Sequence, residues 1–314
     1  MRTRQLGHTG AEVSQLCLGT MYFGTRVDPE MSRRVLDAYV EAGGTFLDTA
    51  NGYAHWIEGW KGGESETLLG KWMRERGNRA QLFLATKVGF DYPGVERGLR
   101  ARVIEEECEK SLRRLGVDYI DLYYAHVDDR NTLLEETLEA FDRLVKAGKV
   151  RFIGASNYLA WRLEQARCIS QMNNWASFCC IQQRYTYLPL QPGQSTAPQV
   201  MVNDDLLDYC RSTGMTLLAY SVLLGGAYTR EDRPLPREFS GPGDEVRLST
   251  LRAIAEETGG TVNQVVMAWM MQLSPSILPI IAASNEEQLR DNLGALDIRL
   301  SDEQMERLNS ARFA

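Results

Sequence analysis

The feature that most constrains this chain is the alternation of short apolar segments with helical ones along its 314 residues. Eight short runs are rich in β-branched and aromatic residues. Several are almost continuously apolar, which is typical of parallel strands buried on both faces. The runs are Gln15–Thr20, Thr45–Thr49, Leu82–Val88, Tyr119–His126, Arg151–Ser156, Cys179–Tyr185, Thr216–Ser221 and Ile277–Ala282. Eight strands that alternate with helices predict an α/β fold, a (β/α)8 TIM barrel.

Helical segments lie between or after these strands, with apolar residues at helical spacing. They are Met31–Ala42, Val103–Leu115, Thr132–Ala147, Thr261–Leu273 and Glu286–Leu293. The first three end at Gly43, Gly116 and Gly148, and glycine is a common helix stop. Thr261–Leu273 is apolar on most sides, so we expect it to be well buried.

The remaining segments complete one barrel domain over residues 1–314. Thr3–Leu6 and Ala11–Val13, with glycines between them, predict an N-terminal β-hairpin at the closed end of the barrel. Gln191–Val200 and Arg230–Glu245 are rich in proline and glycine and follow strands. We therefore expect two long loops at the C-terminal, catalytic face.

Composition limits the classes of partner. The net charge is −7, which argues against nucleic acid or a membrane surface as a partner. No apolar run approaches the roughly 20 residues of a membrane span, and the N-terminus leads into no apolar stretch. The six cysteines form no Cys-x-x-Cys pair and the three histidines lack metal-ligand spacing. We therefore predict reduced thiols, a cytoplasmic location and no metal site, with no sequence support for an oligomer.

The chain lacks the two common glycine-rich nucleotide-binding motifs. No G-x-G-x-x-G follows a strand, and no G-x-x-x-x-G-K-[ST] occurs. The alternative architecture, a doubly wound sheet with a Rossmann site, therefore lacks its motif. Any nucleotide must be held in another way.

Polar residues at the strand ends indicate the chemistry. Asp48 and Tyr53 follow the second strand, Lys87 ends the third and His126 ends the fourth. Strand ends meet at one mouth of a barrel, where a buried lysine needs a carboxylate partner such as Asp48. We expect the lysine cation to lower the pKa of Tyr53, so that the phenol protonates a carbonyl oxygen that His126 holds. This set polarises a carbonyl but supplies no reductant, so it implies a cofactor.

Several motifs in this order resemble the aldo-keto reductase superfamily, in the branch related to potassium-channel β-subunits. They are Gly44-Thr45-Phe46-Leu47-Asp48-Thr49-Ala50 through Tyr53, Thr86-Lys87, His126, Ile153-Gly154-Ala155-Ser156-Asn157, Gln182, Ala219-Tyr220-Ser221, and Gln288-Leu289 with Asn292-Leu293. The resemblance implies an NAD(P)H-dependent reductase of aldehydes or ketones. It implies a catalytic tetrad of Asp48, Tyr53, Lys87 and His126.

The resemblance also implies how the cofactor is held. It implies a nicotinamide carboxamide at Ser156, Asn157 and Gln182, with the ring stacked on Tyr220. It implies a pyrophosphate along Ser221, Leu223 and Gly225, and an adenosine end against Ser284, Gln288 and Asn292. NADPH is the first choice by resemblance. NADH is the alternative, because Glu286 and Glu287 follow the last strand. Their carboxylates would repel a 2′-phosphate at that place.

The segment after Tyr53 departs from the family pattern, since ten residues precede the helix start at Glu64-Ser65-Glu66. Trp56 and Trp60 lie in it, and Tyr22 and Tyr92 lie on neighbouring strand-end loops. Aromatic faces over a polar site suit a sugar, a glycoside or a related ring-bearing carbonyl. The alternative is that the tryptophans only pack the loop onto the barrel. A further alternative for the whole chain is a nicotinamide-binding regulatory barrel of the channel β-subunit type with little turnover.

Overall fold

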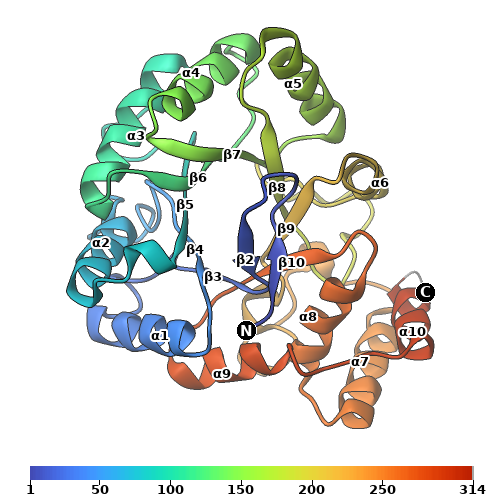
Figure 1. The fold of residues 1–314 in the computed structure, drawn as a ribbon. Helices are drawn as coiled ribbons and strands as arrows, with labels where there is room; N and C mark the ends of the chain where they lie inside the picture. Colours follow the sequence, from blue (N-terminus) through green and yellow to red (C-terminus); the bar gives the residue numbers. More distant parts are fainter. Residues whose placement is uncertain (313–314) are drawn as a thin grey trace.

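Eight parallel strands close into a barrel in the computed structural model, which describes residues 1–312 (Figure 1). The strands follow one another round the barrel in chain order, and the last pairs with the first. They are β3 (Cys17–Gly19), β4 (Phe46–Asp48), β5 (Phe83–Val88), β6 (Ile120–Ala125), β7 (Val150–Ser156), β8 (Phe178–Arg184), β9 (Thr216–Tyr220) and β10 (Ile277–Ile281). Each overlaps one run expected from the sequence, so the predicted (β/α)8 barrel is confirmed.

Helices surround the barrel (Figure 1). Within residues 1–312 they are α1 (Pro29–Glu41), α2 (Glu64–Arg76), α3 (Ala101–Leu115), α4 (Leu134–Lys146), α5 (Ala160–Asn173), α6 (Asp204–Thr213), α7 (Asp244–Thr258), α8 (Val262–Gln272), α9 (Glu286–Gly294) and α10 (Asp302–Arg312). Helix α8 buries every residue from Val265 to Met271, as its apolar sequence predicts. No helix in the described part of the chain is long and apolar enough to cross a membrane.

Four of these helices, α5, α6, α7 and α10, have no counterpart in the sequence analysis. The hydrophobic periodicity of α5, α7 and α10 is weak, whereas α6 is amphipathic but only ten residues long. Helix α10 buries only Leu308 and Ala311, and α6 buries only Leu206 and Cys210. The sequence predicts reduced and buried thiols; all six cysteines are free and four are buried, but Cys168 is exposed and Cys179 is only partly buried.

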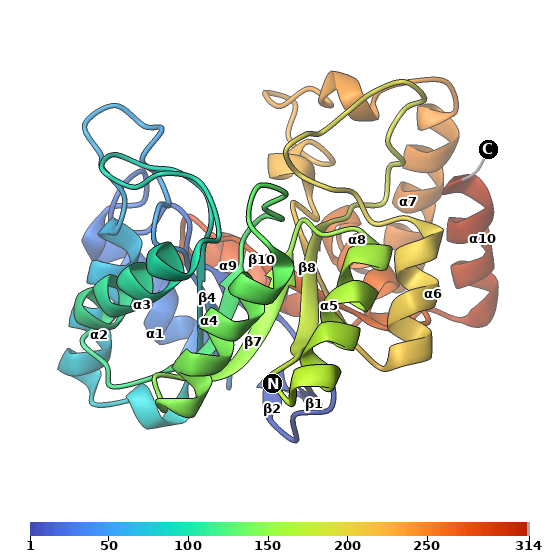
Figure 2. The same cartoon turned by 90° about the horizontal axis from the view of Figure 1, so that it is seen from above.

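A hairpin of β1 (Thr3–Gln5) and β2 (Glu12–Ser14) closes one end of the barrel, and the long loops lie at the opposite end (Figure 2). Leu6 and Val13 are fully buried and pack among interior side chains that include Phe46 and Leu278. The Gly7 amide donates a hydrogen bond of 2.7 Å to Thr216 Oγ1. The expected position of the hairpin is therefore confirmed, and the open end is left for the site.

Candidate active site

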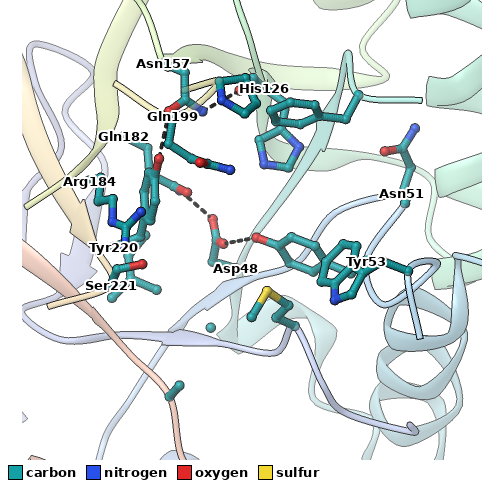
Figure 3. Close-up of a pocket in the computed structure, with 18 of the residues that line it drawn as sticks. Asp48, Asn51, Tyr53, His126, Asn157, Gln182, Arg184, Gln199, Tyr220 and Ser221 are labelled. Atoms are coloured by element: carbon teal, nitrogen blue, oxygen red, sulfur yellow. Dashed lines mark hydrogen bonds between the residues drawn. The ribbon is translucent and has the colours of Figure 1, made fainter. Parts of the chain in front are cut away.

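A cavity of about 560 Å³ opens at the C-terminal ends of the strands (Figure 3). Residues at or after the ends of all eight barrel strands line it, from Gly19 at the end of β3 to Ala282 after β10. The lining includes eight residues that the sequence analysis selected: Asp48, Tyr53, Trp56, His126, Asn157, Gln182, Tyr220 and Ser221. Side chains from distant parts of the chain thus meet at one mouth, as barrel topology requires.

Lys87 is the buried centre of the predicted tetrad. Its Nζ donates to Asp48 Oδ1 at 2.5 Å, to the Thr49 carbonyl at 2.7 Å and to the Tyr53 hydroxyl at 2.7 Å. An ammonium has three donors, so all are used. Burial lowers the pKa of Lys87, and the negative charge of Asp48 opposes that shift. The ammonium therefore keeps its charge through its carboxylate partner.

Asp48 is held on both oxygens. Its Oδ1 accepts from Lys87, and its Oδ2 accepts from Gln182 Nε2 at 2.9 Å. The distance from the Tyr53 hydroxyl to Asp48 Oδ1 is 3.5 Å, too long for a strong hydrogen bond. The phenol proton is therefore free to reach a substrate oxygen in the cavity.

The pKa of Tyr53 differs from the expectation. Burial, followed by the negative charge of Asp48, raises the pKa of this phenol well above its usual value. The predicted lowering by Lys87 is wrong for the free protein, because burial of the phenol and the charge of Asp48, which lies 2.5 Å from the lysine, outweigh the lysine charge. Tyr53 is therefore protonated at neutral pH, the form that gives a proton to a carbonyl.

His126 stands across the cavity from Tyr53 in a neutral state. Burial and then the charge of Lys87 lower the pKa of its imidazole well below the usual value. Its ring is edge-on to Tyr53, with centroids 6.0 Å apart, and to Phe90, with centroids 4.7 Å apart. A neutral imidazole can hold a carbonyl oxygen by an N–H bond, but it is a poor proton source at neutral pH.

The residues that the resemblance assigns to the nicotinamide form one connected group. The Tyr220 hydroxyl donates to Asn157 Oδ1 at 2.7 Å, and Asn157 Nδ2 donates to Ser156 Oγ at 3.1 Å. Asn157 and Ser221 have positive φ values of 60° and 57°, a strained backbone that clusters at ligand sites. A flat ring bordered by amides at the cavity wall fits a nicotinamide with its carboxamide.

The other predicted cofactor residues lie outside the cavity lining. Ser156 is fully buried behind Asn157. Leu223 and Gly225 lie in the turn after β9, and Gly225 is part of a short 3-10 segment at Leu224–Gly226. Ser284 precedes α9, Gln288 lies in its first turn and Asn292 near its end, where Asn292 Nδ2 donates to the carbonyl of Ala282 at 3.0 Å. Ala282 lines the cavity, so Asn292 is hydrogen-bonded to a residue of the cavity wall.

Only one of the four predicted substrate aromatics reaches the cavity. Trp56 lines it and is 51% exposed, whereas Trp60, Tyr22 and Tyr92 do not line it. The Tyr92 hydroxyl instead donates to Glu107 Oε2 at 2.6 Å, and Asn51 Nδ2 donates to the same oxygen at 2.7 Å. Tyr92 therefore ties its loop to helix α3.

The sequence analysis missed several lining residues, among them Phe90, Arg184 and Gln199. Arg184 lies two residues beyond Gln182, so the two-residue period of a strand places it on the same face. Phe90 lies two residues beyond the end of β5, so the argument from strand ends that selected Lys87 could also have selected it. Gln199 belongs to a long loop, and no local pattern of the sequence marks it.

The comparisons with known proteins agree with this geometry. A family model described as the Aldo/keto reductase family matches residues 15–312. The chain belongs to the aldo/keto reductase family. A solved structure, that of the thermostable aldo-keto reductase Tm1743 with the inhibitor epalrestat, is 32% identical. It covers 99% of this chain with a TM-score of 0.79, and the match spans 100% of that chain.

Curated relatives of this aldo-keto reductase are oxidoreductases. An uncharacterized oxidoreductase, YrpG of Bacillus subtilis, is 33% identical over 98% of this chain and 95% of its own length. Norsolorinic acid reductase stcV of Emericella nidulans is 34% identical over 94% of this chain and 77% of its own. An aryl-alcohol dehydrogenase [NADP(+)] of Phanerodontia chrysosporium is 31% identical over 98% of this chain and 85% of its own. This chain is thus an NAD(P)H-dependent carbonyl-reducing enzyme.

Proposed function

We propose that this aldo-keto reductase delivers a hydride to the carbonyl carbon of a ring-bearing aldehyde or ketone, with Tyr53 as the proton donor. The observation that carries the proposal is the Lys87 ammonium, 2.7 Å from the Tyr53 hydroxyl and 2.5 Å from Asp48. A reduced nicotinamide supplies the hydride when bound. Tyr53 supplies the proton, so that the carbonyl becomes an alcohol.

Each tetrad residue has a separate role in this proposal. Lys87 stabilises the negative charge that develops on Tyr53 as the proton leaves. Asp48 keeps Lys87 charged in its buried position. His126 is neutral and donates an N–H to the carbonyl oxygen, which orients the carbon for attack. Asn157, Gln182 and Tyr220 hold the nicotinamide against the cavity wall.

NADPH is the cofactor we propose. One relative carries NADP(+) in its name. Glu286 and Glu287 oppose a 2′-phosphate at the start of α9, but Arg34 lies 3.5 Å from Glu286 and offsets part of that charge. The helix N-terminus also favours an anion. NADH is the alternative, and a parallel titration decides between the two.

The proposed substrates are cyclic, and we name two classes. Trp56 and Phe90 border the cavity beside Tyr53 and His126, and aromatic faces of this kind pack against rings. Sugars and glycosides offer polar rings, whereas aryl carbonyls offer flat ones. The named relatives include an aryl-alcohol dehydrogenase and norsolorinic acid reductases, which makes aryl aldehydes the natural comparison set for sugars.

The test is Tyr53→Phe, assayed with NADPH and NADH against a panel of sugar and aryl carbonyls. We expect turnover to fall by about a thousandfold or more, since one general acid is worth roughly 100-fold to 10,000-fold. Cofactor affinity, measured by tryptophan fluorescence, should stay unchanged. The matched control is Tyr119→Phe, at the start of β6 and away from the mouth. Turnover retained by Tyr53→Phe would remove Tyr53 from this role, and a wild type that binds neither cofactor would overturn the proposal.

A further inference from the structure

Arg184 is a cation on the wall of the cavity that the tetrad does not use. It ends β8 and pairs in register with Tyr220 of β9, the residue assigned to the nicotinamide. Both line the cavity together with Ser221, and Arg184 is drawn beside the Tyr220 ring (Figure 3). Its guanidinium is thus on the side of the cavity where β9 leads into the turn at Leu224–Gly226.

The guanidinium of Arg184 lacks a polar partner. Within residues 1–312 it makes no ion pair or hydrogen bond, and its Nε is buried without any acceptor. Its Cζ lies 5.1 Å from the ring centroid of Phe239, which is fully buried. A cation-π contact offsets some of the lost hydration but leaves the buried Nε–H without an acceptor. A buried donor of this kind in a cavity needs an acceptor, and the natural one for a guanidinium is an anion.

The backbone holds this side chain at the wall. The Arg184 amide donates to the Val200 carbonyl at 3.2 Å, and the Arg184 carbonyl accepts from the Val202 amide at 3.0 Å. The Gln191 amide donates to the Glu238 carbonyl at 2.8 Å, which joins the two long loops of the catalytic face. The backbone of Arg184 is therefore fixed against the loop after β8, and the contact with the Phe239 ring holds its guanidinium near the loop after β9.

The charge balance of the cavity indicates the kind of anion. Arg184 is the one arginine or lysine among the described lining residues. Lys87 is occupied by Asp48, and His126 is neutral. A dinucleotide carries a diphosphate with two negative charges, whereas Ser221, Leu223 and Gly225 contribute no cation. A diphosphate that crosses from Tyr220 toward Ser221 passes along the wall that holds Arg184.

We propose that Arg184 is a further cofactor-binding residue, whose guanidinium pairs with the diphosphate of the bound dinucleotide. This inference rests on the proposed function. It adds a cation to a lining that otherwise holds no arginine or lysine among the described residues, and it explains an arginine whose Nε is buried without an acceptor. Arginine suits the task, because its planar donors match phosphate oxygens in pairs.

The test compares Arg184→Met, which keeps the length of the side chain, with Arg184→Lys, which keeps the charge. The dissociation constants of NADPH and of 2′-phospho-ADP-ribose are measured by fluorescence titration and competition at low and high salt. For Arg184→Met we expect both ligands to bind at least about tenfold more weakly, because a charged hydrogen bond is lost. The salt dependence of binding should also flatten. Arg184→Lys should recover part of the loss.

The matched control is Arg211→Met on α6, an exposed arginine paired with Asp208 and absent from the cavity lining. It should bind both ligands like the wild type. If Arg184→Met does not fold, as judged by circular dichroism, Arg184→Gln replaces it.

One result would overturn the assignment while the wild type still binds NADPH, namely an unchanged NADPH dissociation constant in Arg184→Met. If KM for 4-carboxybenzaldehyde also rose relative to benzaldehyde in that variant, the guanidinium would instead serve an anionic substrate. A wild type that binds neither nicotinamide overturns the proposed function itself, so the two failures are distinguishable.

Discussion

A single buried ammonium organises the chemistry at the mouth of the barrel. Lys87 reaches Tyr53, Asp48 and the Thr49 carbonyl, and burial raises the pKa of Tyr53 while it lowers the pKa of His126. These opposite shifts have one cause, since a low-dielectric site favours the neutral form of both an acid and a base. The result is a protonated phenol facing a neutral imidazole, a pair suited to carbonyl reduction.

The pH dependence of reduction follows from these two shifts. In the proposed mechanism Tyr53 acts as its protonated form, so activity is lost as the pH rises through a pKa that lies well above 10. His126 acts as its neutral form, so activity is lost as the pH falls through a pKa well below 6.5. We expect kcat/KM for carbonyl reduction to be level between about pH 6 and pH 9. A decrease of kcat/KM with a midpoint at about pH 8 would instead show that the pKa of Tyr53 drops when the cofactor binds.

At the scale of elements, the loop between β4 and α2 gives the mouth its aromatic rim. Gly62 has a φ of 93°, and a Cβ there would lie 2.9 Å from the Tyr92 ring and 3.2 Å from Gly52 Cα. The loop therefore folds back tightly on its own start and on the loop after β5. Glu107 of α3 accepts from both Asn51 and Tyr92, which ties the two loops to the barrel. Trp56 is presented to the cavity by this arrangement.

Trp56→Ala tests whether Trp56 contacts a ring-bearing substrate, and Trp60→Ala in the same loop is the matched control. We expect KM for ring-bearing carbonyls to rise by about fivefold to tenfold, because an aromatic contact of about 1 kcal/mol or more is lost, with little change in kcat. Trp60→Ala should leave KM unchanged, since Trp60 does not line the cavity although it is less exposed, at 38% against 51%. Steady-state kinetics with one cyclic and one linear aldehyde measure this. An equal rise of KM in both variants would contradict a specific role for Trp56.

At the scale of the whole molecule, stability and catalysis lie at opposite ends of the barrel. The hairpin inserts Leu6 and Val13 into the barrel interior at one end, and the tetrad occupies the other (Figure 2). The packing of the hairpin at the closed end therefore does not constrain the loops that surround the cavity. This separation lets the substrate-facing loops vary without loss of the core.

Leu6→Ala should separate the two properties. We expect the free energy of unfolding to fall by about 2–5 kcal/mol, because a fully buried side chain leaves a cavity among interior residues. kcat/KM should be unchanged at temperatures where the variant is folded. Denaturant unfolding and kinetics at 25 °C check both, with Leu133→Ala as the control, since Leu133 is 73% exposed. A large loss of kcat/KM in the folded variant would show that the two ends are coupled.

The sequence by itself determined the barrel, the hairpin and the order of the tetrad, because buried parallel strands require apolar runs and strand ends must meet at one mouth. It could not determine which side chains of long loops turn inward: Trp56 lines the cavity, whereas Trp60 and Tyr92 do not. It predicted the wrong direction for the pKa of Tyr53, because desolvation and the partner of Lys87 depend on burial. It also passed over Arg184, which becomes notable only when the fold leaves its Nε buried and unpaired. Local pattern specifies the scaffold, whereas burial and charge balance, which only the tertiary structure decides, specify the site.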